Sequence, residues 1–215
     1  MPSSAARPIP NRQSQRLAAI LGAAEQVFLE KGYERGSLDD VARQANASKA
    51  TIYAHFGNKL GLLRAILQSR VSQITEPLKA AETAHAPVRD VLEEFGCNFL
   101  RTLLSPGPIK FYRLMVAEGV NFPDLARAWF DGGPSTNIAK LTAFLKHRIA
   151  LGELHAPDPE TIAEFFLMAL RGTLHMQAAA GLIHPPFDAA INAKVEAAVD
   201  MIMRAYGPKI EGAKR

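Results

Sequence analysis

Prolines and glycines divide most of this chain into short segments, each with apolar residues at helical spacing. Proline cannot continue a helix and glycine commonly ends one, so this punctuation sets where helices stop. The chain has no run of alternating β-branched residues long enough for a strand, so the sequence predicts an all-α fold. The expected helices run from Gln13 to Gly32, from Lys59 to Pro77, and over 87–104, 109–121, 124–131, 134–151, 158–181 and 187–206.

Composition excludes several classes of chain. The 215 residues are 48% hydrophobic and 21% charged, which is ordinary for a globular protein, and the single cysteine, Cys97, excludes an internal disulfide. No stretch approaches the roughly 18 apolar residues that a membrane span needs. The apolar segment 17–24 ends at Glu25, yet its helical spacing continues beyond, so we interpret it as a helix rather than a signal sequence. A cytoplasmic protein is expected.

The N-terminal third is basic. Residues 1–75 contain ten Lys/Arg and five Asp/Glu, a net charge of +5, whereas residues 76–215 contain fifteen and sixteen, a net charge of −1. A basic segment favours a polyanionic partner such as DNA, RNA or a membrane surface. A solvated charged face would give the same composition, so charge alone leaves the two interpretations open.

Two short helices joined by a tight turn are predicted within this basic segment. Ser37 begins the first, with Asp40 three residues later as in a capping box, and Ser48 begins the second. Asn46 between them tolerates the left-handed conformation of a tight turn. The pair matches the helix-turn-helix arrangement, in which one helix braces a second that enters the DNA major groove. The expected bracing residues are Leu38, Val41, Ala42, Ala45, Ile52 and Phe56.

The residues of this segment resemble a known family. The stretch SLDDVARQANASKATIYAHFGNKLGLLRAIL is similar to the signature of TetR/AcrR transcriptional regulators, and the resemblance covers about residues 13–70. Asn46 and Ala47 stand where the family has Gly and Val, and Leu60 stands where it has an acid. Further along, FYRLMVAEGVNFPDLARAWFDGGP, LRGTLHMQAAAGL and AVDMIMRAYG resemble the AefR-like C-terminal domain. The matching signature positions are Ser37, Ala42, Ala45, Ser48, Thr51, Tyr53, Phe56 and Lys59.

The resemblance implies a homodimeric regulator, usually a repressor, that a small molecule releases from a near-palindromic double-stranded DNA operator. The aromatic and Met residues over 95–131 favour a largely apolar molecule. The resemblance implies no cofactor, metal or membrane partner. We expect a disordered arm over 1–12, a helix-turn-helix domain over 13–58, a helical ligand-binding and dimerisation domain over 59–206 and a flexible tail over 207–215.

The same resemblance assigns DNA contacts. Ser37, Tyr53, His55 and Lys59 would contact phosphates, which set orientation on the duplex, while side chains at the start of the second short helix would face base edges. For Tyr53 and His55 the alternative is packing against their own helix. Arg7 and Arg12 are either a minor-groove arm or part of a solvated tail. The full DNA-binding set is Ser37, Ser48, Lys49, Ala50, Thr51, Tyr53, His55 and Lys59.

Aromatic and Met residues concentrate over 95–131, with few polar residues among them. Small-molecule sites have this composition, although plain helical core has it too. Arg113 needs a partner, which could be Glu118, another acid or an anionic ligand. His175 shares a helix face with Arg171 and is a further pocket candidate. The expected ligand-binding residues are Phe95, Phe99, Phe111, Tyr112, Arg113, Met115, Phe122, Trp129, Phe130 and His175.

The resemblance places the helices over 158–181 and 187–206 at a dimer interface, as a four-helix bundle across a two-fold axis. The residues expected there are Phe165, Met168, Arg171, Val195, Val199, Ile202 and Met203.

Two functions other than transcriptional regulation are alternatives for this sequence. One is a ligand-binding or scaffold protein whose N-terminal part does not bind DNA. The other is a small helical enzyme, which the sequence disfavours because it has no Gly-rich phosphate loop and its six His are scattered without metal-ligand spacing.

Overall fold

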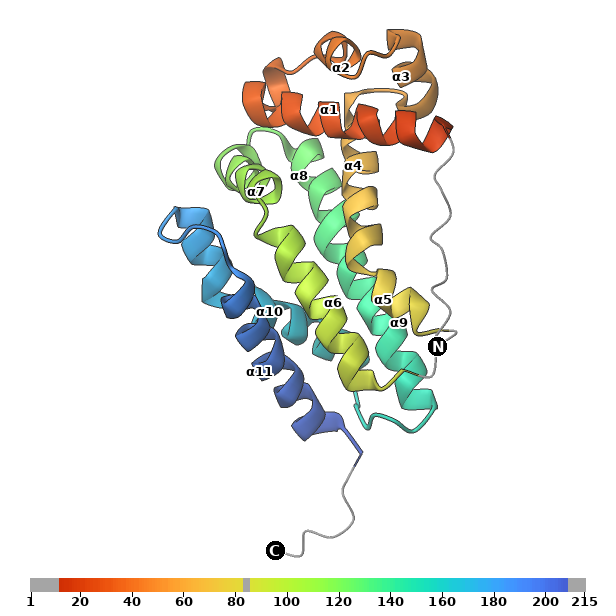
Figure 1. Cartoon of the computed structure of the whole chain (residues 1–215), viewed down its shortest axis with the longest axis vertical. Helices are drawn as coiled ribbons and strands as arrows, with labels where there is room; N and C mark the ends of the chain where they lie inside the picture. Colours follow the sequence, from red (N-terminus) through yellow and green to blue (C-terminus); the bar gives the residue numbers. More distant parts are fainter. Residues whose placement is uncertain (1–11, 83–85, 209–215) are drawn as a thin grey trace, which may run out of the picture. The chain divides into compact units, whose positions relative to one another are not determined.

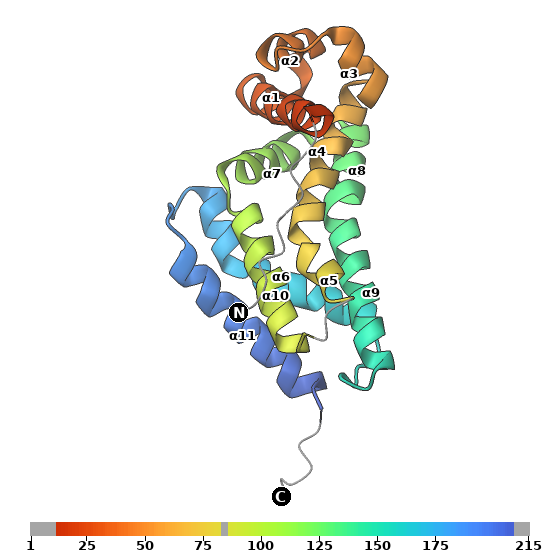
Figure 2. The same cartoon turned by 45° about the vertical axis from the view of Figure 1, so that its right-hand side comes forward.

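The computed structural model describes residues 12–82 and 86–208, and every regular element in these ranges is helical, which confirms the all-α prediction (Figures 1 and 2). The chain forms two compact units, of which the first ends at Ile66 and the second begins at Leu67. Both residues lie inside one helix, whereas the boundary predicted from the sequence lies at the start of that helix, between residues 58 and 59.

The first unit is a small helical domain around a single apolar core. Its members are α1 Arg12–Arg35, α2 Leu38–Gln44, α3 Lys49–Phe56 and the first part of α4 Lys59–Ile74. Ile52 is fully buried, and Ala42, Ala45 and Phe56 pack against the core from partly buried positions, as predicted for the bracing face. The buried core consists of Ile20, Ala23, Ala24, Val27, Phe28, Leu38, Val41, Ile52, Leu62 and Ile66.

Local chain chemistry sets the ends of these helices. The predicted capping box is present: the Asp40 N–H donates to Ser37 Oγ over 3.1 Å, and the Ser37 N–H donates to Asp40 Oδ2 over 3.3 Å. Asn46 has φ +48°, the left-handed conformation that its turn requires. Gly32 breaks the first helix as predicted, with φ +79°, and a short helical segment follows it to Arg35 within the bounds of α1.

The second unit is a bundle of longer helices. Pro77 lies in the first turn of a short separate helix, α5, which sequence analysis did not expect; proline suits that position because first-turn N–H groups have no intrahelical partner. The helices are α5 Glu76–Ala80, α6 Val88–Leu103, α7 Pro106–Glu118, α8 Pro123–Phe130, a π-helical turn Asp131–Ser135, α9 Thr136–Ala150, α10 Pro159–Ala180 and α11 Asp188–Tyr206.

Within this bundle α10 packs against both α9 and α11, and α11 packs against α6 (Figures 1 and 2). Phe95 on α6 and Phe166 on α10 stack at the centre, with ring centroids 6.5 Å apart. Gly96 permits the close approach of α6 and α11, because a Cβ at this position would lie 3.0 Å from Val195 Cγ1. In the part of the chain that the structure describes, no helix is long and apolar enough to cross a membrane.

Candidate DNA interface and effector site

Hydrogen bonds from its own cap and from α1 fix the N-terminus of α3. The Thr51 N–H donates to Ser48 Oγ over 3.1 Å, and the two hydroxyl oxygens lie 2.8 Å apart. The Arg16 guanidinium on α1 donates to Thr51 Oγ1 over 3.4 Å. Sequence analysis counted Arg16 only as charge, because a contact between residues so distant in the chain leaves no local signal. These contacts hold the end of the helix that is expected to meet base edges.

One face of α3 is open to solvent. Ile52 is turned into the core and is fully buried, whereas Lys49, Ala50, Tyr53 and His55 are exposed, Tyr53 by 48%. About half of Tyr53 is nevertheless covered, and the His55 ring is tilted against Phe56 with centroids 6.1 Å apart, so packing against their own helix stays an alternative for both residues. The expected base-facing and phosphate-facing roles of these residues stay predictions.

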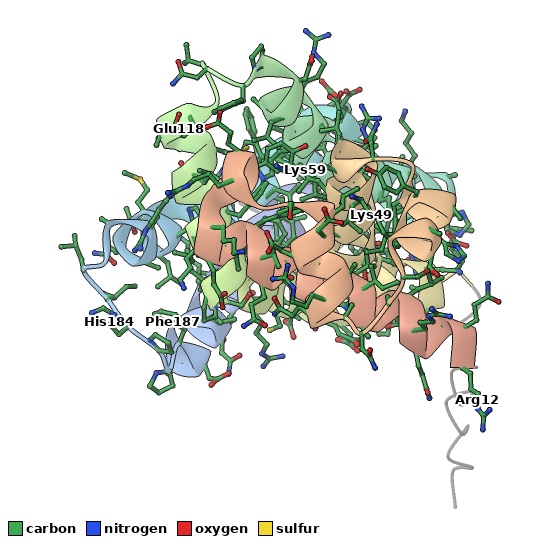
Figure 3. The ribbon with its side chains drawn as sticks, turned by 90° about the horizontal axis from the view of Figure 1, so that it is seen from above. Arg12, Lys49, Lys59, Glu118, His184 and Phe187 are labelled. Atoms are coloured by element: carbon green, nitrogen blue, oxygen red, sulfur yellow. The ribbon has the colours of Figure 1, made fainter. Side chains whose placement is uncertain are left out.

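Lys49 forms an ion pair across the turn (Figure 3). Its Nζ lies 2.8 Å from Asp39 Oδ1, and this hydrogen-bonded partner raises the pKa of Lys49. Both side chains are about half exposed or more. Because exposed ion pairs contribute little to stability, the pair with Asp39 does not prevent Lys49 from meeting a base or phosphate.

Ser37 and Lys59, both predicted phosphate contacts, have partners inside the first unit. The Ser37 hydroxyl donates to Asp40 Oδ2 over 2.8 Å, and hydrogen bonds from Lys31 and Ser37 hold the Asp40 pKa at about 2. Lys59 Nζ donates to Glu34 O over 2.8 Å (Figure 3). It also lies 4.5 Å from the ring centroid of Tyr33, close enough for a cation–π interaction, and burial lowers its pKa. The phosphate contacts of both residues stay predictions.

The N-terminal arm falls largely outside the described residues, and Arg7 is among those that are not described. Arg12 is the first residue of α1 and is exposed, so it starts a helix rather than belonging to an arm (Figure 3). A minor-groove role for either arginine stays a prediction.

The predicted effector residues do not form one site: Met115 is buried, Phe111 and Phe122 are partly buried, and five others fall into two groups. Phe95 and Phe99 are buried in the core of the second unit, where their rings stack with centroids 6.2 Å apart. Phe130 is 52% exposed, so it lines no enclosed site within this unit. The structure instead gathers a second group around the ring of Tyr112 on α7. Its remaining members are Trp129 on α8 and Arg171 and His175 on α10.

Tyr112 is the centre of that second group. The His175 ring meets it edge-on with centroids 4.6 Å apart, and the Trp129 ring is tilted against it at 6.3 Å. The Arg171 guanidinium carbon lies 4.6 Å from the Tyr112 ring centroid, a cation–π distance. We call Tyr112, Trp129, Arg171 and His175 the α7–α10 cluster. Sequence analysis assigned Arg171 to the dimer interface, but it is half-buried in this cluster.

His175 is the most buried polar residue of the cluster, with 1% of its surface exposed. Its Nδ1 accepts a hydrogen bond from Arg171 Nε over 3.2 Å. Burial, and secondarily the positive charge of Arg171, lowers the pKa of His175 to about 4, so the imidazole is neutral at physiological pH. Among the described residues, Nε2 is one of four buried side-chain polar atoms without a partner, and all four belong to α9 and α10.

Arg113 has neither of the expected acidic partners. Its guanidinium donates to the Ala178 carbonyl oxygen over 3.1 Å and to the Ala179 carbonyl, at the C-terminal end of α10. Glu118, the acid considered in its sequence neighbourhood, instead accepts a hydrogen bond from Asn121 Nδ2 over 3.1 Å (Figure 3). The last carbonyls of a helix lack intrahelical donors and carry partial negative charge, so a cation there is stabilising. Arg113 therefore caps α10.

Three of the residues expected at the dimer interface lie inside the chain's own core. Val195, Val199 and Ile202 are each at most 3% exposed and face α6, so they are unavailable to a second subunit and the expectation must be corrected. Met203 is partly buried against the same core. Phe165 and Met168 on α10 are 61% and 48% exposed. Sequence periodicity located an apolar stripe on α11 but could not tell which neighbour buries it.

The first unit thus presents a capped, exposed helix behind a tight turn, and the described residues contain no group of His, Cys, Asp or Glu able to hold a metal ion. A capped, exposed helix behind a tight turn, followed by a second helical unit, is the arrangement of helix-turn-helix proteins. Two family models match: bacterial regulatory proteins of the tetR family over residues 20–66, and the AefR-like transcriptional repressor C-terminal domain over residues 90–208. The chain belongs to the TetR family of DNA-binding transcriptional regulators, whose members are not enzymes.

Individual relatives agree with this assignment. The HTH-type transcriptional regulator SrpR of Pseudomonas putida is 27% identical over 135 residues, which are 63% of this chain and 62% of SrpR, less than two thirds of its length. A TetR-family regulator from Mesorhizobium loti shares the fold with TM-score 0.73 and 24% identity, covering 93% of this chain and all of that one. The Flavonoid-responsive Regulator FrrA has TM-score 0.65 and 29% identity, covering 91% and 98% of the two chains.

Proposed function

We propose that the chain is a homodimeric repressor that reads a near-palindromic operator with α3 and is released by a small, largely apolar molecule bound in its second unit. The exposed outer face of α3, held by its cap and by Arg16, is the observation that carries the proposal. The description of the matching C-terminal domain as that of a repressor supports the sign of regulation. Operator binding requires access to the chromosome, which supports a cytoplasmic location.

The outward face of α10 supports a dimer. Phe165 and Met168 are 61% and 48% exposed, and their spacing of three residues places them on one side of the part of α10 before Gly172. Met176, after the non-helical Gly172, is 67% exposed. Large apolar side chains gathered on an exposed helix face are typical of protein–protein contacts. A two-fold axis through this face would pair α10 with its copy, and two copies of α3 would then read two half-sites.

Release by an effector follows from linkage. A ligand that binds one spacing of the two reading heads more tightly than the other lowers operator affinity by that difference. The α7–α10 cluster supplies aromatic faces and a buried imidazole in the second unit, as a site for a mostly apolar ligand requires. That FrrA is described as flavonoid-responsive also supports an aromatic effector here.

Operator binding is tested by fluorescence anisotropy, with DNA from upstream of the chain's own gene. Tyr53→Phe should weaken binding to all operator variants alike, whereas Lys49→Ala should change which base substitutions are tolerated. Lys140→Ala, which removes an exposed charge from α9, is the control and should leave affinity and preference unchanged. Wild-type affinity in Tyr53→Phe together with wild-type base preference in Lys49→Ala would refute the assignment of α3 as the reading helix.

Lys59→Met separates a phosphate contact from a structural role. If the ammonium leaves Glu34 O to meet a phosphate, the slope of log affinity against log salt becomes shallower by about one. If the ammonium stays on the carbonyl, the slope is unchanged and only the stability of the first unit falls. Either outcome for Lys59 leaves the assignment of α3 as the reading helix unchanged, because the Tyr53 and Lys49 variants test that assignment.

A further inference from the structure

The α7–α10 cluster contains a donor without an acceptor. Arg171 Nε carries a hydrogen and donates it to His175 Nδ1 over 3.2 Å, so Nδ1 must present its lone pair. A neutral imidazole with a bare Nδ1 holds its proton on Nε2. Only 1% of the surface of His175 is exposed to solvent. Its Nε2–H has no hydrogen-bond partner among the described residues. The contact with Arg171 therefore fixes both the ring and its tautomer.

Leaving such a donor unpaired is costly. A buried polar hydrogen without an acceptor loses its hydration and gains no protein hydrogen bond. The nearby Tyr112 ring can offer only a weak acceptor, its π face. Arg171 cannot serve, because a guanidinium has no acceptor atom. Neither Tyr112 nor Arg171 therefore pairs the Nε2–H with a strong acceptor.

We infer that His175 Nε2–H is the polar recognition point of the effector site, and that the effector is an uncharged aromatic molecule whose carbonyl or equivalent acceptor oxygen meets it. This inference rests on the proposed effector site and names the chemistry of its ligand. The aromatic part of the ligand would pack against Tyr112 and Trp129, whose rings already lie 6.3 Å apart in a tilted pair. The acceptor oxygen would complete the hydrogen bonding of the imidazole.

The cluster favours an uncharged ligand over a carboxylate. The guanidinium of Arg171 is already placed against the Tyr112 ring at 4.6 Å and commits its Nε to His175. Side-on recognition of a carboxylate through Nε and one Nη would break the hydrogen bond to His175, which leaves only the two Nη groups for such a ligand. Arg171 is a positioning residue here, since it acts on the ligand through the tautomer of His175.

Two probes of nearly equal shape test the inference. Acetophenone carries the acceptor oxygen, and α-methylstyrene replaces that oxygen with a CH₂ group. The ratio of their Kd values is measured by ligand-observed NMR on the full chain, for the wild type and for His175→Phe. Comparing the ratio between proteins cancels the different costs of removing the two probes from water. We expect His175→Phe to lose roughly tenfold of the preference for acetophenone.

Two further variants make the test specific. His175→Gln keeps an N–H donor near the position of Nε2 and should restore part of the preference. His184→Phe, a change at an exposed histidine, should leave the wild-type ratio intact. A ratio that is the same in wild type and His175→Phe, or absence of binding by both probes at millimolar concentration, would overturn the inference. Tighter binding of benzoate than of acetophenone would overturn it too, because Arg171 would then be the recognition point.

Nitrogen-15 NMR of the unsubstituted protein covers the case in which His175→Phe fails to fold. Ligand-free His175 should show the Nε2–H tautomer, and acetophenone should shift that proton while α-methylstyrene does not. An Nδ1–H tautomer would refute the argument. Operator affinity without a probe is measured on the same sample. A protein that does not bind the operator would count against the proposed regulator alone. A protein that binds the operator but whose preference between the probes does not depend on His175 would count against this inference alone.

Discussion

The substitution Gly61→Ala should destabilise the first unit through a backbone clash. A Cβ at Gly61 would lie 2.0 Å from the Phe56 carbonyl oxygen and 3.1 Å from its carbon. Real Cβ contacts essentially never fall below 3.0 Å, so the end of α3 and the start of α4 would have to separate by about 1 Å. Both partners are backbone atoms, and no side-chain rotation can relieve the contact. Overpacking of this kind costs about 1–3 kcal/mol.

Gly22→Ala supplies a matched control in the same unit. Gly22 lies in α1, is exposed, and a Cβ there would meet nothing within 4 Å. The same substitution should therefore stabilise the unit by about 0.5–1 kcal/mol, because alanine is the better helix former. Both variants replace a glycine with alanine, but the expected changes in the stability of the unit have opposite signs.

Urea and thermal unfolding followed by circular dichroism measure both variants. For a unit of this size the melting temperature shifts by about 4–8 °C per kcal/mol. Hydrogen exchange of amides in α1 to α4 assigns the transition to the first unit, since the single Trp, Trp129, reports only on the second. A Gly61→Ala protein as stable as the wild type, or a Gly22→Ala protein destabilised equally, would refute the reasoning.

Three further predictions concern the second unit. Arg113→Met should lower the free energy of unfolding by about 0.5–2 kcal/mol, and with it the melting temperature, with or without ligand, since it removes the donor to the last carbonyls of α10. Because the pKa of His175 is lowered, the unfolded chain binds a proton at this residue more readily than the folded chain does, so stability should fall as pH drops from about 6.5 to about 4. In urea titrations, His175→Gln should flatten this dependence of stability on pH, whereas the control His184→Gln should leave it in place. Met168→Glu should give folded monomers in light scattering, whereas Val199→Glu should unfold the chain, because it buries a charge in the core; a folded monomer from Val199→Glu would contradict that placement.

The reading head was largely predictable from sequence. The capping box of Ser37, the cap at Ser48 and the left-handed Asn46 all act within a few residues of the chain, and the structure has each of them. The hydrophobic spacing of α2 and α3 also gave their buried face correctly, including Leu38 and Ile52. The predicted DNA contacts go beyond this local chemistry, because they require the duplex, and they stay predictions.

The effector site was predictable only in part. Tyr112, Trp129 and His175 were expected at a pocket, and the structure brings them together, but Phe95 and Phe99 from the same aromatic stretch form core instead. Periodicity shows which face of a helix is apolar. It does not distinguish packing against a neighbouring helix from lining a site, since both demand the same side chains.

What the sequence alone determined are features encoded over one or two helical turns: helix positions, their caps, the tight turn and the all-α class. Tertiary structure decided the partner of every long polar side chain that matters here. Arg113 meets carbonyls of α10, Lys59 meets Glu34, and Arg171 sets the tautomer of His175. The reason is physical: a buried hydrogen-bonding group needs a partner, but its own sequence neighbourhood does not say which group three-dimensional packing will bring within 3 Å.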